Sequence, residues 1–277
     1  MKKTILGLVS LLISIGCIYF CFQGKDHPST RNSIAEKTIA DSPYRDIVYA
    51  FVSSAENSST DYEQQYSYIE DIQDGRGYTA GIIGFTSGTG DLLEVIKQYQ
   101  RIKPENNSLV KYLDPLENVD GSDSHEGLGT SFEDDWKKAG QTEELIQAQD
   151  EIVDKMYLSP AVKYAEKDHL SLLGQYIYYD ALVVHGPGED PDSFNGIRKE
   201  ALKASKAPSQ QRDEAEYLSA FLQARTKIMQ KEEAHEDLSR IDFQQRLIDE
   251  KNYDIALPIS WVMYGDTFEL TEEDAGK

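Results

Sequence analysis

Apolar residues at helical spacing dominate this sequence from Pro43 onward, and one glycine-rich segment interrupts them. Over 43–57, apolar side chains recur three and four residues apart, which predicts a helix. The interruption at 75–90 mixes β-branched and aromatic residues with glycines, which is typical of short strands and tight turns. We therefore expect a mainly α (α+β) fold with one small β-sheet near residues 74–90.

The same spacing predicts further helices over the later part of the chain. The clearest start belongs to the helix at 160–167, because Ser159 is a favoured N-cap residue and Pro160 suits the first helical position. The tail over 257–270 is expected to add an extended piece. The full set of further predicted helices is 91–102, 131–139, 142–157, 160–167, 171–185, 192–204, 211–231 and 240–250.

The beginning of the chain has the composition of an export signal. An uncharged, mostly apolar run over 5–22 follows Lys2 and Lys3, so we interpret 1–22 as a signal peptide or an uncleaved membrane anchor. A polar linker is predicted over 23–42, and a single catalytic domain over 43–277. Both cysteines lie inside the first segment, so no disulfide or thiolate metal site is expected after it. The protein is expected to be secreted.

The chain is strongly acidic, with 49 Asp and Glu against 28 Lys and Arg and a formal net charge of -21. This charge repels nucleic acid and acidic lipid surfaces, attracts a cationic partner, and also favours solubility. None of the five histidines has the spacing of a zinc motif. We therefore expect no metal and no cofactor.

Two carboxylates stand out in the acidic stretch that follows the first predicted helix. Glu56 lies in the last turn of that helix, where the helix dipole disfavours an ionised carboxylate, as a general acid requires. Asp74 lies at a turn beside Arg76, a cation that favours its ionised form. Two carboxyl groups in contrasting environments are the requirement for glycosidic hydrolysis. The other acids of this stretch are expected to form a solvated surface.

Several motifs of this chain resemble the glycoside hydrolase family 46 chitosanases. The resemblance spans essentially 43–266, and its longest block runs from Asp74 to Asp91. The motifs that carry it are Ser53–Ser59, Tyr68–Ile72, Asp74–Phe85, Ser87–Asp91, Tyr178–Ala181, His185–Gly188, Asp190–Phe194, Gly196–Lys199 and Tyr264–Asp266.

The resemblance implies a lysozyme-like, two-lobed helical fold with a cleft between the lobes. It also implies an endo-acting, inverting hydrolase of β-1,4 links between glucosamine residues in chitosan, with Glu56 as general acid and Asp74 as general base. Thr79 helps to hold the attacking water in this family, and Asp91 is expected to meet a sugar ammonium. The matching substrate-binding positions are Asn57, Tyr68, Arg76, Asp91 and His185. The family pattern has an Asp where this chain has Glu236, so a substrate contact there is left open.

Three charged residues are predicted on apolar helix faces. Asp180 shares a stripe with apolar residues of the 171–185 helix, and Arg225 and Arg240 do the same on later helices. A lone buried charge costs several kcal/mol, so we expect the three to meet. The resemblance suggests that they link toward the catalytic base, and we predict a buried network that holds Asp74 ionised and oriented.

Two other functions agree less well with the sequence. A lysozyme-like hydrolase of peptidoglycan would share the fold and the general acid, but the negative charge disfavours an anionic cell wall as substrate. A noncatalytic amino-sugar binding module is disfavoured because Glu56, Asp74 and Thr79 are all present. The expected partner is chitosan, a cationic polysaccharide, bound by a monomer with no protein partner.

Overall fold

The computed structural model describes residues 37–210, 213–231 and 237–274. The predicted signal peptide or anchor, most of the predicted linker, and Glu236 lie outside these residues. The prediction of a linker is wrong for 37–42, because Ile39 is 0% exposed and its N–H donates to Gln175 Oε1 at 3.0 Å. Among the described residues, no helix has the length and apolar character that a membrane crossing requires.

Most of the predicted helices are present within a few residues of their expected bounds. Helix α3 was not predicted, since it is short and contains Pro115. The α-helices of the described residues are α1 (Tyr44–Asn57), α2 (Asp91–Ile102), α3 (Leu113–Val119), α4 (Phe132–Ala139), α5 (Glu143–Val153), α6 (Ser159–Asp168), α7 (Leu172–His185), α8 (Phe194–Ala204), α9 (Glu214–Met229) and α10 (Ser239–Asp249). Short 3₁₀ turns are η1 (Tyr62–Ser67), η2 (Val110–Tyr112) and η4 (Pro208–Gln210).

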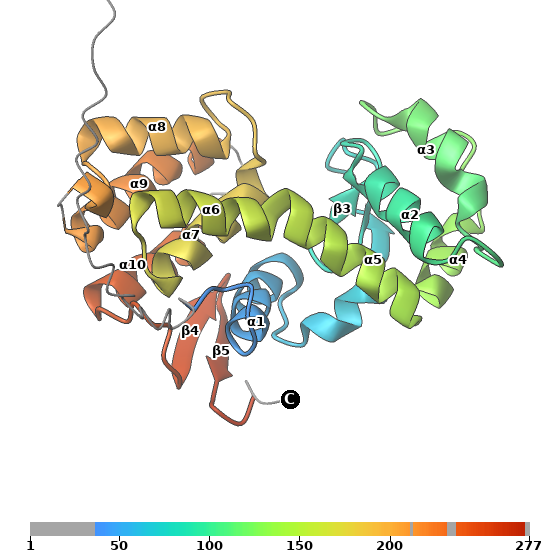
Figure 1. The fold of residues 1–277 in the computed structure, drawn as a ribbon. Helices are drawn as coiled ribbons and strands as arrows, with labels where there is room; N and C mark the ends of the chain where they lie inside the picture. Colours follow the sequence, from blue (N-terminus) through green and yellow to red (C-terminus); the bar gives the residue numbers. More distant parts are fainter. Residues whose placement is uncertain (1–36, 211–212, 232–236, 275–277) are drawn as a thin grey trace, which may run out of the picture. The chain divides into compact units, whose positions relative to one another are not determined.

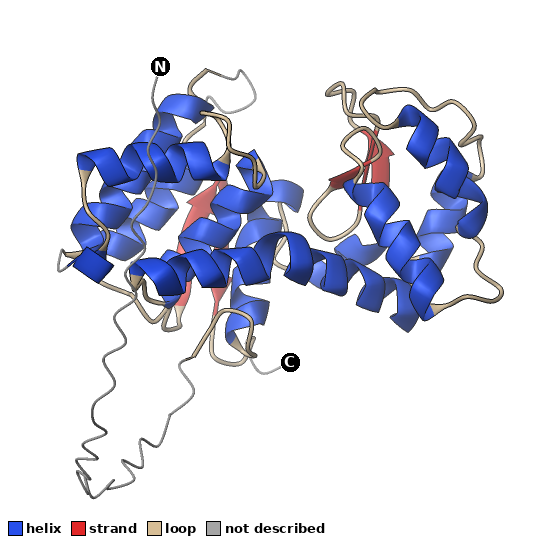
Figure 2. Ribbon diagram, turned by 45° about the horizontal axis from the view of Figure 1, so that its top comes forward, coloured by secondary structure: helices blue, strands red, loops and turns tan. Residues whose placement is uncertain are grey.

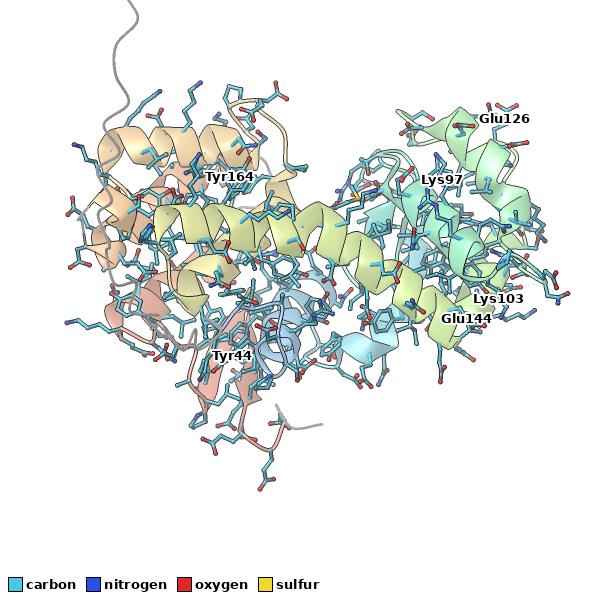
Figure 3. The ribbon with its side chains drawn as sticks, in the orientation of Figure 1. Tyr44, Lys97, Lys103, Glu126, Glu144 and Tyr164 are labelled. Atoms are coloured by element: carbon cyan, nitrogen blue, oxygen red, sulfur yellow. The ribbon has the colours of Figure 1, made fainter. Side chains whose placement is uncertain are left out.

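Residues 37–274 form two groups of elements, which confirms the expected two-lobed helical fold. Helices α2 to α4 and a small sheet make one lobe, and α7 to α10 with a β-hairpin make the other (Figures 1 and 2). Helices α5 and α6 run between the lobes. In the first lobe α2 packs along α5, and Lys103 pairs with Glu144 at 3.0 Å near the ends of these helices (Figure 3).

The helix between the lobes does not start where the sequence suggested. Helix α5 passes through a π turn, η3 (Asp154–Leu158), directly into α6. Ser159 is helical, with φ -61° and ψ -41°, and its N–H bonds the carbonyl of Asp154, five residues earlier. The predicted N-cap is therefore wrong: Ser159 and Pro160 continue a helix, because the wider π turn takes up the break in hydrogen bonding that a proline causes.

The predicted sheet exists but begins earlier than expected. Strands β1 (Ile69–Asp71), β2 (Tyr78–Ala80) and β3 (Phe85–Thr86) pair in an antiparallel sheet in that order. Thr79 lies opposite both Glu70 and Thr86. Asp74 lies in the connection between β1 and β2, so the sheet presents this carboxylate on a turn.

A second sheet corrects the expectation of a merely extended tail. Strands β4 (Ile259–Met263) and β5 (Asp266–Leu270) form an antiparallel hairpin, and alternate residues of β4 are buried. Tyr264 and Gly265 form its two-residue turn.

An aromatic cluster holds this hairpin against α1. The ring of Trp261 on β4 lies 5.0 Å from that of Phe51 and 5.2 Å from that of Phe243 on α10. Trp261 Nε1 also donates to Ser54 Oγ at 2.9 Å. These contacts fix the last turns of α1, where Glu56 is found.

Candidate active site

Glu56 is the penultimate residue of α1 and lies at the boundary between interior and solvent. Its Oε1 accepts a hydrogen bond from Arg240 Nη1 at 2.7 Å. The Glu56 side chain is 31% exposed, whereas that of Arg240 is only 4% exposed. A buried arginine from α10 therefore supports a carboxylate that solvent can reach.

Arg240 belongs to a buried network that also contains Asp180 and Arg225. Arg240 Nε donates to Asp180 Oδ1 at 2.8 Å, and Arg225 Nη1 donates to Asp180 Oδ2 at 2.5 Å. Gln244 Nε2 donates to the same Oδ2 at 2.7 Å. The structure thus brings together the three residues that the sequence grouped, and it adds Gln244, which lies one helical turn after Arg240 on the same face of α10.

Charge balance explains why this network includes Glu56. Asp180 with two arginines leaves one surplus positive charge, and Arg240 directs that charge at the carboxyl group of Glu56. Burial alone would raise the pKa of Asp180, but Arg240 and Arg225 outweigh burial and hold that pKa well below its usual range. A paired and hydrogen-bonded set of this kind avoids the cost of an isolated buried charge.

The expectation that the network reaches Asp74 is wrong for the contacts that the structure describes. Asp74 instead pairs with Arg76, whose backbone N–H donates to Asp74 Oδ1 at 3.0 Å and whose Nε donates to Oδ2 at 2.8 Å. Arg76 Nη2 lies 2.5 Å from the same Oδ2. Asp74 is therefore oriented locally, by the turn that carries it, and Glu56 is the carboxylate held by the network.

Thr79, in the middle of β2, has an unusual hydroxyl. The residue is buried, and its Oγ1 has no hydrogen-bond partner among the residues that the structure describes. Buried polar atoms are normally paired, so an unpaired hydroxyl is an exception that calls for an explanation. The strand that follows the Asp74 turn therefore carries an unused hydrogen-bonding group.

Asp91 is the first residue of α2, and its carboxylate organises the chain around it. Its Oδ1 accepts hydrogen bonds from the backbone of Thr86 at 2.7 Å and of Leu92 at 2.9 Å. The Thr89 hydroxyl donates to the same oxygen at 2.9 Å, whereas Tyr157 approaches the other oxygen, Oδ2, at 3.4 Å. Burial raises the pKa of Asp91, although these hydrogen bonds oppose the rise. Oδ1 is thus committed to the fold, and Oδ2 is the less occupied oxygen.

The remaining predicted substrate positions, Asn57, Tyr68 and His185, lie in three different parts of the chain. Tyr68 donates to Glu70 at 3.3 Å from the residue before β1, and Asn57, at the end of α1, contacts Ser53 at 3.5 Å. His185, the last residue of α7, accepts from Arg225 Nε through its Nε2 at 3.1 Å. His185 is therefore joined to the buried network, a link that the sequence did not reveal.

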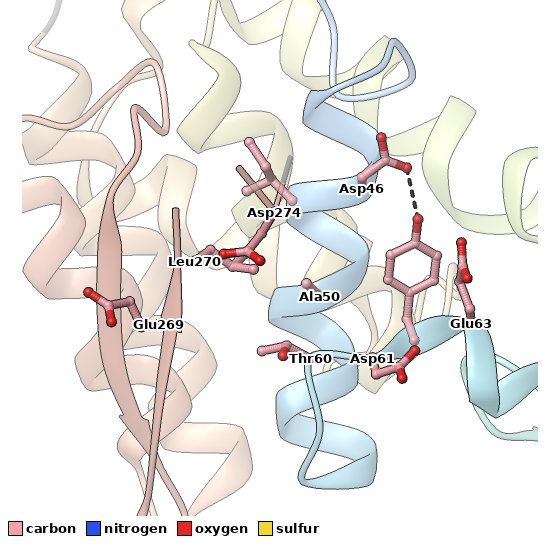
Figure 4. A pocket seen from close by; sticks show the side chains of 10 residues that line it. Asp46, Ala50, Thr60, Asp61, Glu63, Glu269, Leu270 and Asp274 are labelled. Carbon is pink, nitrogen blue, oxygen red and sulfur yellow. Dashed lines mark hydrogen bonds between the residues drawn. The ribbon is translucent and has the colours of Figure 1, made fainter. Parts of the chain in front are cut away.

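A separate cavity of about 350 Å³ lies beside the first half of α1 (Figure 4). Five carboxylates line it, and neither Glu56, Asp74 nor Thr79 is among its lining residues. Within the described ranges, no group of His, Cys, Asp and Glu is suited to hold a metal ion. The five carboxylates are Asp46, Asp61, Glu63, Glu269 and Asp274.

The helical two-lobed fold, with a solvent-reached Glu56 on a buried cation and a second carboxylate on the sheet turn, is that of a glycoside hydrolase. The model of glycosyl hydrolase family 46 matches residues 50–259. The chain belongs to this family, as its motifs indicated.

Relatives and solved structures agree with this assignment. The chain is 51% identical over 244 residues to a chitosanase of Nocardioides sp. (strain N106), covering 88% of this chain and 87% of the relative. It is also 51% identical to a chitosanase of Streptomyces sp. (strain N174), covering 89% and 90%. A solved chitosanase co-crystallised with substrate is 50% identical, with a TM-score of 0.83, covering 85% of this chain and 100% of that chain.

Proposed function

We propose that this protein is a secreted chitosanase that hydrolyses internal β-1,4 links between glucosamine residues with inversion at the anomeric carbon. The observation that carries the proposal is the ion pair between Glu56 and Arg240. It holds one carboxylate at the solvent end of a network that is otherwise buried. The chitosanase relatives and the substrate co-crystal of a relative support the same conclusion.

Glu56 is the general acid in this proposal. As its proton passes to the leaving glycosidic oxygen, negative charge develops on the carboxylate, and the Arg240 guanidinium at 2.7 Å stabilises that charge. Arg240 itself is held in place by Asp180. The network thus supplies a preorganised cation at the position where charge appears.

Asp74 is the general base and acts on water from the other side of the sugar. Its pairing with Arg76 holds the carboxylate in place on the turn between β1 and β2. The unpaired hydroxyl of Thr79, on the next strand, provides a hydrogen-bonding group for the attacking water. An inverting enzyme needs both a base and room for this water.

The substrate is proposed from charge as well as from the relatives. A chain with a formal net charge of -21 attracts a polymer whose amines are protonated in weakly acidic water. Asp91 Oδ2, which has one long contact at 3.4 Å, is the proposed acceptor for one sugar ammonium. The proposal requires no cofactor and no protein partner, and a monomer suffices.

The test is to incubate the purified full chain with chitosan and, separately, with bacterial cell walls. We expect a rapid fall in chitosan viscosity, glucosamine oligomers in the mass spectrum, and no clearing of walls. Glu56→Gln is the matched inactive control. Clearing of walls without cleavage of chitosan would identify a peptidoglycan hydrolase instead. Binding of chitosan without release of oligomers would identify a noncatalytic module.

A further inference from the structure

The turn of the β4–β5 hairpin contains a tyrosine in a backbone conformation that tyrosine disfavours. Tyr264 and Gly265 have φ of 51° and 90°. Two-residue turns with two positive φ values prefer Asn, Asp or Gly, because a larger side chain strains the left-handed region. Strain of this kind is concentrated at functional sites, where something other than stability retains the residue.

The Tyr264 side chain is not retained for packing in the core. The residue is 37% exposed, which makes it one of the few large hydrophobic residues with such exposure among the described residues. Its backbone N–H donates to Ser239 Oγ at 2.9 Å, and Ser239 directly precedes Arg240 in α10. The turn is therefore anchored beside the residue that supports Glu56.

Anchoring of the turn on Ser239 brings Tyr264 to the region of the Arg240–Glu56 ion pair, and both charges act on its phenol. Partial burial raises the pKa of Tyr264, Arg240 opposes the rise, and the nearby Glu56 carboxylate adds to it. An exposed aromatic ring thus borders the proposed general acid.

We propose that Tyr264 is a substrate-contacting residue, and that the sugar which departs with the leaving oxygen packs against its ring. The inference rests on the proposed role of Glu56 as general acid. Because Glu56 must reach the oxygen of that sugar, a side chain bordering Glu56 is within reach of the same sugar. A phenol presents an apolar face to the C–H groups of a pyranose and a polar tip to its hydroxyls or to water.

The experiment measures binding in a Glu56→Gln background, so that a glucosamine hexamer is bound but not cleaved. In this background, Tyr264→Gly removes the ring and relieves the backbone strain. We expect affinity for the hexamer to fall by about three- to tenfold, the size of a lost aromatic contact, while Tm stays equal or rises. Tyr264→Phe retains the ring and should bind within about threefold of the parent. Val262→Ala, on the exposed face of the same hairpin, is the matched control.

Opposite signs for affinity and stability are the distinguishing result. If the Tyr264→Gly variant binds the hexamer with the same affinity as the Glu56→Gln parent, the inference is overturned. A fall in Tm of Tyr264→Gly, with affinity unchanged at a temperature where it is folded, would also overturn it, since the ring would then be structural. If the Glu56→Gln parent itself fails to bind the hexamer, the proposed function fails first, and the two failures are told apart.

Discussion

Arg240 and Glu56 are separated by 184 positions in the sequence, yet their side chains meet at 2.7 Å. Glu56 is the last residue but one of the first helix of the described chain, and Arg240 is the second residue of the last helix. The proposed general acid is therefore complete only after α10 has packed onto α1 and α7. Mutations that loosen α10 should affect catalysis even where they touch no substrate.

Replacing either proposed catalytic carboxyl should abolish most activity without unfolding the protein. Glu56→Gln and Asp74→Asn keep side-chain size and remove proton transfer, so we expect kcat on chitosan to fall by about 10²–10⁴-fold. Reducing-end assays measure the loss, and thermal unfolding checks the fold. If a variant keeps more than about a tenth of the wild-type kcat, the substituted residue is not the general acid or base.

The first product of each cleavage should have the α configuration. A β-linked substrate cut with inversion gives the α-anomer, because water attacks from the face opposite the leaving group. NMR of the earliest products, recorded before mutarotation, is the measurement. A β-anomer would indicate a retaining mechanism. An experimental structure should then show the carboxyls about 6.5–9.5 Å apart or somewhat more, and not near 5 Å.

Thr79→Val should separate catalysis from stability. The substitution removes a buried hydroxyl that has no partner among the described residues, so the free energy of unfolding should be unchanged or slightly higher. We expect kcat to fall about tenfold, because one hydrogen bond to the attacking water is lost. Thr79→Ser, which retains the hydroxyl, should recover most of the rate. Equal rates for the Val and Ser variants would contradict this role.

Arg240→Ala and Arg225→Ala should both destabilise the protein, by roughly 3–5 kcal/mol for a broken buried pair. Their effects on kcat should differ, because Arg240 contacts Glu56 and Arg225 reaches it only through Asp180. We expect the larger loss of kcat in Arg240→Ala, measured well below its Tm. The exposed Arg101→Ala is the control, with an effect within about 0.5 kcal/mol. Equal losses of kcat in the two network variants would argue against a direct role for Arg240.

The stability contributed by Asp180 should depend on pH in one direction. Its pKa is lowered in the folded protein, so this contribution is complete above the unfolded value of about 3.9 and declines as pH falls below it. The difference in unfolding free energy between the wild type and Asp180→Asn should therefore be constant from pH 7 to about 5, and shrink in more acidic solution. Denaturant titrations at several pH values measure it. A difference that grows on acidification would show that Asp180 is not held ionised.

Hydrophobic periodicity predicts most helices of this fold. It does not predict the β4–β5 hairpin or the π turn between α5 and α6. The alternation of Ile259, Trp261 and Met263 is typical of a strand. It is short and lies near the end of a helical sequence, so by itself it predicts an extended piece and not a hairpin. At Ser159 the local cap signal was strong and misleading. The π turn that carries the helix through Pro160 leaves no composition pattern of its own.

For the candidate site too, the sequence predicts some contacts and not others. Helical spacing put Asp180, Arg225 and Arg240 on apolar faces, and burial of charge implied that they meet. Sequence could not say which catalytic carboxylate the network serves, because that depends on how α1 and α10 cross. The charge count of the network was the one sequence signal for a further acid, because Asp180 with two arginines leaves one positive charge without a partner. Glu56 and Asp74 satisfy that count equally well.

The π turn between α5 and α6 also fixes the direction in which the side chains of α5 point relative to those of α6. Each residue of a helix advances the direction of its side chain by about 100°, so one extra residue within a turn rotates everything before it relative to everything after it. Arg45 is joined to Asp154 at 2.7 Å and Tyr157 approaches Asp91 at 3.4 Å, so both partners depend on that direction. A single-residue deletion between 154 and 158 would turn the elements on one side of this axis relative to those on the other. In this fold, the angle at which the two lobes meet can therefore change by one codon.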